Sequence, residues 1–272
     1  MKTKPVRVKE TIVVGRFSIP YRIYENKGPQ FICVNGVQQS MAMWQTLVAR
    51  FSNRYRMVLF DFPNQGKAKI LSGSSEVTLD EQIEILAAVM DKAGLSKDAT
   101  ICAASWGGVI AVALASRYPS RVKKLVLASL GTKPNKKMVE TIKEGSNLAM
   151  QDRDKMAHVL IRSFGETLPA RIKQNIVNQF RAMKEENVQS FYDHGLLVIS
   201  SKSLGDIVNL KNITAKTILL NGENDTIIDL DDVKFLASQI PNCKLMIIKG
   251  VGHFLHMESD KVLDIYEEIL RS

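Results

Sequence analysis

Ser105 is the first residue whose surroundings suggest covalent chemistry, and it lies in the segment Ala103-Ala-Ser-Trp-Gly107. An apolar run typical of a strand precedes it, and a helical pattern follows it. A sharp strand-to-helix turn would expose the serine hydroxyl, and small residues two positions before and after the serine let the chain turn without a clash. The same motif also suits a tight turn with a buried structural serine. Catalytic partners for the serine elsewhere in the sequence are therefore needed to distinguish a nucleophile from a structural residue.

A serine hydroxyl is a weak nucleophile at neutral pH and needs a base, normally a histidine that a carboxylate orients. Asp225 follows an apolar run at 217–220, and His253 follows another at 244–248. Both residues should therefore emerge at the carboxyl edge of a parallel sheet, where open α/β sheets place their sites. The sequence predicts a catalytic triad of Ser105, His253 and Asp225 that works through an acyl-serine intermediate.

Other residues compete with the predicted acid and base. The rivals are Glu223, Asp229, Asp231 and Asp232 for the acid, and His256 for the base. We prefer Asp225 because it directly follows a strand, whereas Asp231 and Asp232 suit the first turn of a helix and its dipole. The other histidines, His158 and His194, fall in a helical stretch where a solvated or packing role is expected.

Acyl chemistry also needs donors for the oxygen that becomes negatively charged in the transition state. The backbone N–H of Trp106 is one candidate, and that of Val37, in the loop after Asn35-Gly36, is the other. Gly36 permits the turn that aims this amide inwards. We assign Asn35 and Gly36 to the substrate-binding loop, where Asn35 either holds the loop by side-chain hydrogen bonds or is a turn residue.

Alternating strands and helices must position these residues. Strands are expected at 21–25, 30–34, 57–60, 99–103, 124–128, 217–220 and 244–248, and helices at about 44–51, 80–93, 106–117, 231–239 and the carboxyl terminus. Repeated βα units predict an α/β fold with a mostly parallel sheet flanked by helices. Residues 131–205 interrupt this alternation, because they show helical spacing and no strand pattern. We therefore predict a single domain, residues 1–272. Its α/β core comprises 1–130 and 206–272, and residues 131–205 form an inserted helical cap.

Several apolar residues of the expected cap could line an acyl pocket. They are Met138, Leu148, Met150, Val159, Leu160, Ile161 and Phe164. Apolar residues at helical spacing more often form the core of their own helices, so the sequence favours that role.

Composition bounds the kinds of partner. The net charge is +9, but no helix-turn-helix, RNA-binding or zinc-finger pattern accompanies it, so an acidic carrier protein or a phosphate-bearing coenzyme suits this charge better than nucleic acid. We see no metal-binding pattern, Walker loop or GxGxxG fingerprint, and we expect neither a metal nor a bound cofactor.

The location is also an expectation from composition. No apolar run approaches the ~20 residues of a membrane-spanning helix, so no integral membrane segment is expected. The basic start is not followed by an apolar stretch, which disfavours a secretory signal. Cys33, Cys102 and Cys243 are odd in number and lie in predicted strands, which indicates reduced thiols in a cytoplasmic protein.

From Gln30 onwards the chain resembles the α/β-hydrolase superfamily, and several segments resemble the bacterial 3-hydroxyacyl transferases. These are the rhamnolipid-precursor synthase and the 3-hydroxyacyl carrier-protein to coenzyme A transacylase. The resemblance rests on Val34-Asn-Gly36, Val58-Leu-Phe-Asp61 with Pro63 and Gly66, Ser105-Trp-Gly-Gly108, Phe164-Gly165 with Leu168-Pro169, Asn221-Gly222, and Gly252-His-Phe-Leu255 with Glu258. It implies 3-hydroxyacyl transfer from an acyl carrier protein or coenzyme A thioester.

The resemblance has limits, and three alternatives stay open. Thr226-Ile-Ile-Asp229 and Lys67-Ala-Lys69 depart from the segments expected in those transferases. A carboxylesterase, thioesterase or lactonase would share every candidate residue. A carbon–carbon bond hydrolase would differ by its substrate, and a binding protein of the same fold would hold a ligand without turnover.

Overall fold

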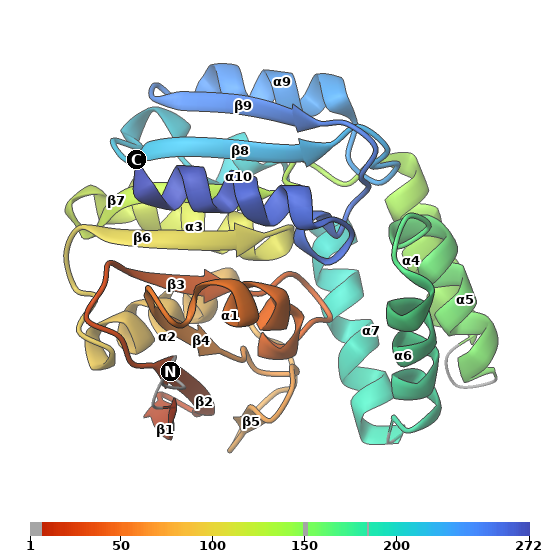
Figure 1. Ribbon diagram of the computed structural model, residues 1–272. Coiled ribbons are helices and arrows are strands. Elements are labelled where there is room, and N and C mark those ends of the chain that lie inside the picture. Colours follow the sequence, from red (N-terminus) through yellow and green to blue (C-terminus); the bar gives the residue numbers. More distant parts are fainter. Residues whose placement is uncertain (1–6, 149–151, 184) are drawn as a thin grey trace.

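A computed structural model describes residues 7–148, 152–183 and 185–272, and its central feature is a single nine-stranded sheet (Figure 1). The strands are β1 (Arg7–Val14), β2 (Phe17–Tyr24), β3 (Gln30–Val34), β4 (Arg56–Phe60), β5 (Lys69–Ile70), β6 (Ala99–Ala104), β7 (Val122–Ala128), β8 (Lys216–Gly222) and β9 (Cys243–Ile248). Their order is β1-β2-β4-β3-β6-β7-β8-β9, with β5 paired to β2. All pairs from β4 to β9 are parallel, and β1, β2 and β5 are antiparallel additions at one end.

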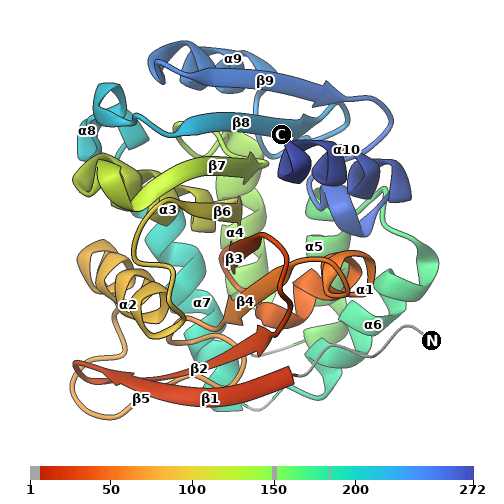
Figure 2. The same cartoon turned by 60° about the vertical axis from the view of Figure 1, so that its left-hand side comes forward.

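Helices cover both faces of this sheet (Figures 1 and 2). One face packs against α2 (Leu79–Lys92), α3 (Trp106–Arg117) and α9 (Leu230–Gln239), and the other against α1 (Gln45–Phe51) and α10 (Asp260–Arg271). The central strands are apolar on both sides because both faces are covered, as the buried run Phe31–Val34 shows. The predicted α/β fold with a mostly parallel sheet is therefore confirmed.

Among the described residues, five α-helices lie between β7 and β8. They are α4 (Lys136–Leu148), α5 (Arg153–Phe164), α6 (Ala170–Arg181), α7 (Glu185–Ser200) and α8 (Leu204–Ile207). In Figure 1, α4 to α7 stand beyond the arrowheads of β6, β8 and β9, at the carboxyl edge of the sheet. Met156, Val177 and Phe180 belong to a separate small apolar core of these helices, with Leu160 and Ile161 packed against it. Met150, one of the residues expected here, lies outside the described residues.

The described residues include no helix long and apolar enough to cross a membrane. The three cysteines lie in β3, β6 and β9 as free thiols, and Cys33 faces Cys102 across the β3–β6 pair. Burial raises the pKa of the Cys102 thiol to about 12, so this thiol is un-ionised and inert at neutral pH.

Two histidines outside the predicted triad are buried within the fold. His256 stacks on the Trp44 ring, with centroids 4.8 Å apart, and its Nε2–H donates to the carbonyl oxygen of Met43. His194 lies in α7 and is also buried. Burial disfavours the charged form and lowers the pKa of each imidazole to about 4, so both are neutral in the folded protein at neutral pH.

These two histidines should make the protein sensitive to acid. Below about pH 6.5 the unfolded chain takes up a proton at each histidine, whereas the folded protein does not until about pH 4. The free energy of unfolding should therefore fall as the pH drops through this window, by about 3 kcal/mol for each histidine. Denaturant titrations between pH 7 and pH 4 measure this decline.

The variant His256→Phe keeps a ring against Trp44 but cannot take up a proton. We expect its stability to decline with pH less steeply than that of the wild type, by up to about 1.4 kcal/mol per pH unit. The matched control is His158→Phe, at an exposed position of α5, which should keep the wild-type slope. If the stability of His256→Phe and of the wild type declined equally steeply with pH, His256 would not be a source of the acid sensitivity.

Candidate active site

Ser105 occupies the sharp turn between β6 and α3. Its backbone has φ 49° and ψ −123°, a conformation that non-glycine residues rarely adopt. The N–H of Ser105 donates to the Ala128 carbonyl oxygen at 2.8 Å, and its own carbonyl oxygen accepts from the Gly108 N–H at 2.8 Å. The turn is therefore held from both sides. A strained serine at the start of a helix is the geometry of an exposed nucleophile.

Gly107 allows α3 to approach β3 closely. A Cβ at this position would lie 2.4 Å from the carbonyl oxygen of Asn35 and 2.6 Å from that of Val34. Backbone atoms cannot give way over such distances, so a residue with a side chain would push the helix away from the strand. The contact brings the loop after β3 to the start of α3, beside Ser105.

Asp225 and His253 meet at the same edge of the sheet. Asp225 Oδ2 lies 2.9 Å from His253 Nδ1, with both side chains almost fully buried. The other oxygen, Oδ1, accepts from the N–H groups of Ile227 and Ile228 at 2.9 and 3.2 Å. A carboxylate held by two backbone donors fixes the imidazole with its Nδ1–H towards the aspartate, which leaves Nε2 available for another partner.

The loop that carries His253 is held by residues whose roles the sequence did not reveal. Glu258 accepts from the Phe254 N–H at 2.8 Å and also from the Gly252 N–H. The Ser129 hydroxyl donates to the carbonyl oxygen of His253 at 2.7 Å. The ring of Phe164, from α5, packs edge-on against the imidazole with centroids 5.5 Å apart. Glu258 and Phe164 carried a sequence signal as part of the family resemblance, and Ser129 carried none.

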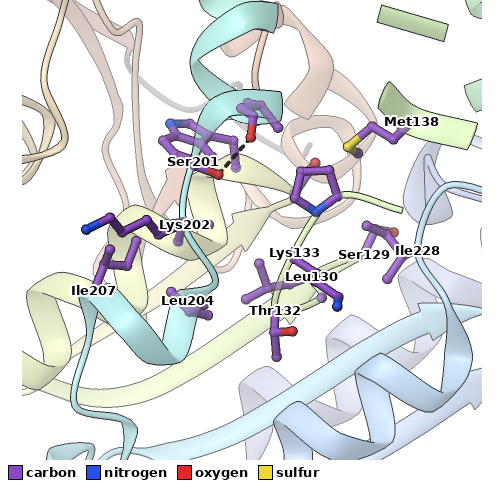
Figure 3. Close-up of a pocket in the computed structure, with 16 residues that line it drawn as sticks. Ser129, Leu130, Thr132, Lys133, Met138, Ser201, Lys202, Leu204, Ile207 and Ile228 are labelled. Carbon is purple, nitrogen blue, oxygen red and sulfur yellow. Dashed lines mark hydrogen bonds between the residues drawn. The ribbon is translucent and has the colours of Figure 1, made fainter. Parts of the chain in front are cut away.

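Ser105 lines two small cavities. One, of about 10 Å³, is also lined by His253, Gln39 and His256, so the serine and the imidazole face the same space. No hydrogen bond joins Ser105 to His253 among the residues that the structure describes. The other cavity, of about 40 Å³, lies between the core and the helices α4, α7 and α8 (Figure 3).

The larger cavity is lined by apolar and polar residues. Its apolar lining includes Trp106, Val109, Leu130, Met138, Val198, Leu204 and Ile228. Its polar lining includes Ser129, Thr132, Lys133, Ser201 and Lys202, which Figure 3 labels. Met138 is thus the residue of the predicted acyl-pocket set that lines this cavity.

The two predicted oxyanion donors lie in different segments, one directly after Ser105 in the sequence and one in the loop after the neighbouring strand β3. Trp106 is the first residue of α3, and Val37 lies in the loop after β3. Within the described ranges 7–148, 152–183 and 185–272, neither backbone N–H has an acceptor. Free N–H groups at the start of a helix and in a tight loop are suited to bind a developing oxyanion.

Asn35 and Gly36 hold this loop. Asn35 is 1% exposed, and its carboxamide donates to the Phe60 carbonyl oxygen and accepts from the Trp44 indole. These contacts support the loop-holding role that the sequence allowed for the Asn35 side chain, because its polar atoms are engaged within the protein. A Cβ on Gly36 would lie 2.6 Å from Gln39 Oε1 and 3.2 Å from the Ala104 carbonyl oxygen, so the loop packs closely against the Gln39 side chain and the end of β6.

The rival residues have other contacts. Asp232 accepts from the N–H and hydroxyl of Thr132, and Asp229 accepts from the Asn135 carboxamide. Asp231 pairs with Lys234 on the surface of α9, and Glu223 accepts from the Gly250 N–H. Among the described residues, no group of His, Cys, Asp and Glu could hold a metal ion.

Comparisons with known proteins agree with this architecture. The family model described as "alpha/beta hydrolase fold" matches residues 29–260. An (R)-3-hydroxydecanoyl-ACP:CoA transacylase from Pseudomonas putida is 23% identical over 251 residues, covering 91% of this chain and 84% of the relative. A 2-hydroxy-6-oxononadienedioate/2-hydroxy-6-oxononatrienedioate hydrolase from Burkholderia vietnamiensis is 28% identical over 223 residues, covering 78% and 75%.

Solved structures show the same fold. An alpha/beta hydrolase enzyme from a Medee basin deep-sea metagenome library superposes with a TM-score of 0.82 at 19% identity, covering 96% of this chain and 97% of the other. A 2-hydroxy-6-oxo-6-phenylhexa-2,4-dienoate hydrolase from Rhodococcus sp. strain RHA1 has a TM-score of 0.82 at 16% identity, covering 98% and 100%. The matched family model spans most of the chain, and this protein therefore belongs to the α/β-hydrolase fold family, whose similar members include transacylases, esterases and hydrolases.

Proposed function

We propose that this protein is an acyl-transferring enzyme with Ser105 as nucleophile, His253 as general base and Asp225 as the orienting acid. The observation that carries the proposal is the buried Asp225–His253 hydrogen bond at 2.9 Å, in a loop whose imidazole faces the same cavity as Ser105. An aspartate in this position sets the tautomer of the imidazole and stabilises its protonated form.

The chemistry follows from these positions. Ser105 Oγ attacks the carbonyl carbon of an acyl ester or thioester and gives its proton to His253 Nε2. The carbonyl oxygen becomes an oxyanion, which the Val37 and Trp106 N–H groups stabilise. The tetrahedral intermediate then expels the alcohol or thiol, which takes the proton from His253. An acceptor, water or another hydroxyl or thiol, releases the acyl group by the reverse sequence.

The proposed substrate is a 3-hydroxyacyl group carried by acyl carrier protein or coenzyme A. The Pseudomonas putida relative, named for this kind of transfer, aligns over most of the chain, and the larger cavity combines apolar walls with hydroxyl groups beside Ser105. Lys133 and Lys202 in its lining have no ion-pair partner among the described residues, which suits a phosphate-bearing carrier. No nucleic-acid partner is proposed.

The helices between β7 and β8 determine whether water or another hydroxyl or thiol accepts the acyl group from Ser105. We interpret residues 131–205 as a cap on a single domain whose core is 1–130 and 206–272, because Met138 and Val198 close the larger cavity from this side. A cap that excludes water favours transfer to a hydroxyl or thiol over hydrolysis. The free cysteines and the proposed carriers suit a cytoplasmic enzyme.

Replacing Asp225 with Asn should lower kcat by about 10⁴-fold, because the imidazole then has the wrong tautomer to accept the serine proton. Initial rates with a nitrophenyl ester or a 3-hydroxyacyl thioester measure the loss. Asp229→Asn is the matched control, since Asp229 is exposed, in the same loop, and a rival by sequence. Equal losses in the two variants would show that Asp225 is not the acid.

The carrier preference has its own test. We expect Lys133→Gln with Lys202→Gln to raise the KM for a coenzyme A thioester about threefold to tenfold, the range of exposed ion pairs, and to leave the phosphate-free pantetheine thioester unaffected. Lys97→Gln, in the exposed segment before β6 at the opposite edge of the sheet, is the control. A KM that rises equally for both thioesters would contradict a phosphate contact.

The same assays separate transfer from hydrolysis. With 3-hydroxyacyl carrier protein as donor and coenzyme A as acceptor, the proposal predicts acyl-coenzyme A as the main product. Free acid as the only product would make the protein a thioesterase, with the same triad. No turnover of either thioester, with turnover of a ring-fission dienone instead, would favour the carbon–carbon bond hydrolases.

A further inference from the structure

The direction of the Val37 N–H is set by the peptide group that it shares with Gly36. This peptide is trans, so its carbonyl oxygen and its N–H point in opposite directions. Whatever holds the Gly36 carbonyl oxygen therefore also aims the Val37 N–H. Gln65 holds it, because Gln65 Nε2 donates to that oxygen at 2.8 Å.

Gln65 is itself fixed by a buried chain of hydrogen bonds. The indole N–H of Trp44 can only donate, and it donates to Asn35 Oδ1 at 2.8 Å. Asn35 Nδ2 must then be the group that faces Gln65, and it donates to Gln65 Oε1 at 3.2 Å. This leaves Gln65 Nε2 to face the Gly36 carbonyl oxygen. Because the indole of Trp44 can only donate, it sets the donor-to-acceptor direction of every hydrogen bond in this series.

The next peptide group, between Val37 and Gln38, is held from the other side. The Gln38 N–H donates to His194 Nδ1, in α7, at 3.5 Å, and the Gln38 carboxamide donates to the Phe191 carbonyl oxygen. Gly195 leaves room for this carboxamide, because a Cβ there would lie 2.9 Å from Gln38 Nε2. Gln38 has φ 59°, so these contacts hold a backbone conformation that is otherwise unfavourable.

We propose that Gln65 is a positioning residue for the reaction, which aims the Val37 N–H at the oxyanion through the Gly36–Val37 peptide, and that His194 steadies the same loop from α7. This inference rests on the proposed function, because it assumes an oxyanion next to Ser105. It assigns a catalytic consequence to a glutamine that lies in a different loop and is 4% exposed. It also connects the inserted helices to the chemistry, since α7 supplies the second contact.

Misaligning an oxyanion donor affects the transition state and leaves ground-state binding unchanged. The test variant is Gln65→Met, which keeps the length of the side chain and removes both of its polar groups. We expect kcat to fall by about 10²-fold, the usual cost of one oxyanion donor, with KM changed less than about threefold.

A pair of inhibitors separates positioning from folding. An alkyl trifluoromethyl ketone adds to a serine hydroxyl and forms a hemiketal oxyanion, whereas the methyl ketone of the same chain binds without addition. We expect the Gln65→Met variant to lose affinity for the trifluoromethyl ketone in parallel with kcat, and to bind the methyl ketone as the wild type does. A wild-type ratio of the two affinities would overturn the inference.

The matched control is Thr217→Val, an isosteric loss of a polar group at another buried position, at the amino end of β8 and thus at the edge of the sheet opposite Ser105. The Thr217 hydroxyl donates to the Ala215 carbonyl oxygen at 3.0 Å, so its loss also leaves a buried polar group without a partner. This control should lose stability and keep the wild-type ratio of ketone affinities. An equal loss of the ratio in both variants would show that the effect is a general loosening of the site.

His194 gives a second route if Gln65→Met does not fold. His194→Leu removes the acceptor for the Gln38 N–H, and His194→Asn keeps an acceptor oxygen near the position of Nδ1. We expect about a tenfold loss of trifluoromethyl ketone affinity in His194→Leu, since the contact is longer, with recovery in His194→Asn. Equal ratios in both variants would remove His194 from the proposal. If the wild type forms no hemiketal, the proposed function itself fails.

Discussion

The left-handed backbone of Ser105 is the constraint on which the candidate site depends. The turn connects β6 to α3 without an intervening loop. Its unfavourable conformation is stabilised because the N–H and the carbonyl oxygen of Ser105 both form backbone hydrogen bonds. Gly107 then lets α3 sit against the carbonyl oxygens at the end of β3. The same short contact that exposes the serine hydroxyl also places the Val37 loop beside it.

The buried Asp225–His253 pair forms the other half of the site. Each residue sits in a loop that directly follows a parallel strand, so the sheet fixes the distance between them. Close packing adds precision, because a Cβ on Gly222 would lie 2.3 Å from the carbonyl oxygens of Val251 and Gly252. Two backbone donors on Asp225 and the Glu258 contacts on the His253 loop leave little freedom in either partner. The site is thus organised before any substrate binds, which is what electrostatic stabilisation requires.

Much of this could be predicted from the sequence because the signals are local. Apolar runs predicted β3, β4 and β6 to β9 to within about two residues, whereas the two-residue strand β5 was not predicted. The positions of Asp225 and His253 follow from the strands before them. What the sequence did not reveal depends on contacts across long stretches of chain. Gln65 reaches Gly36, Ser129 reaches the carbonyl oxygen of His253, and His194 reaches Gln38. Glutamine in a loop after a strand has no periodicity or motif that marks it as buried.

The proposed acyl-serine intermediate can be tested directly by the mass of the intact protein after brief incubation with a 3-hydroxyacyl thioester and an acid quench. The wild type should gain the mass of one acyl group, and Ser105→Ala should gain none while keeping its thermal stability. Peptide mapping should place the adduct on the peptide that contains Ser105. An adduct of equal size in Ser105→Ala, or thioester turnover that persists in that variant, would contradict the serine mechanism.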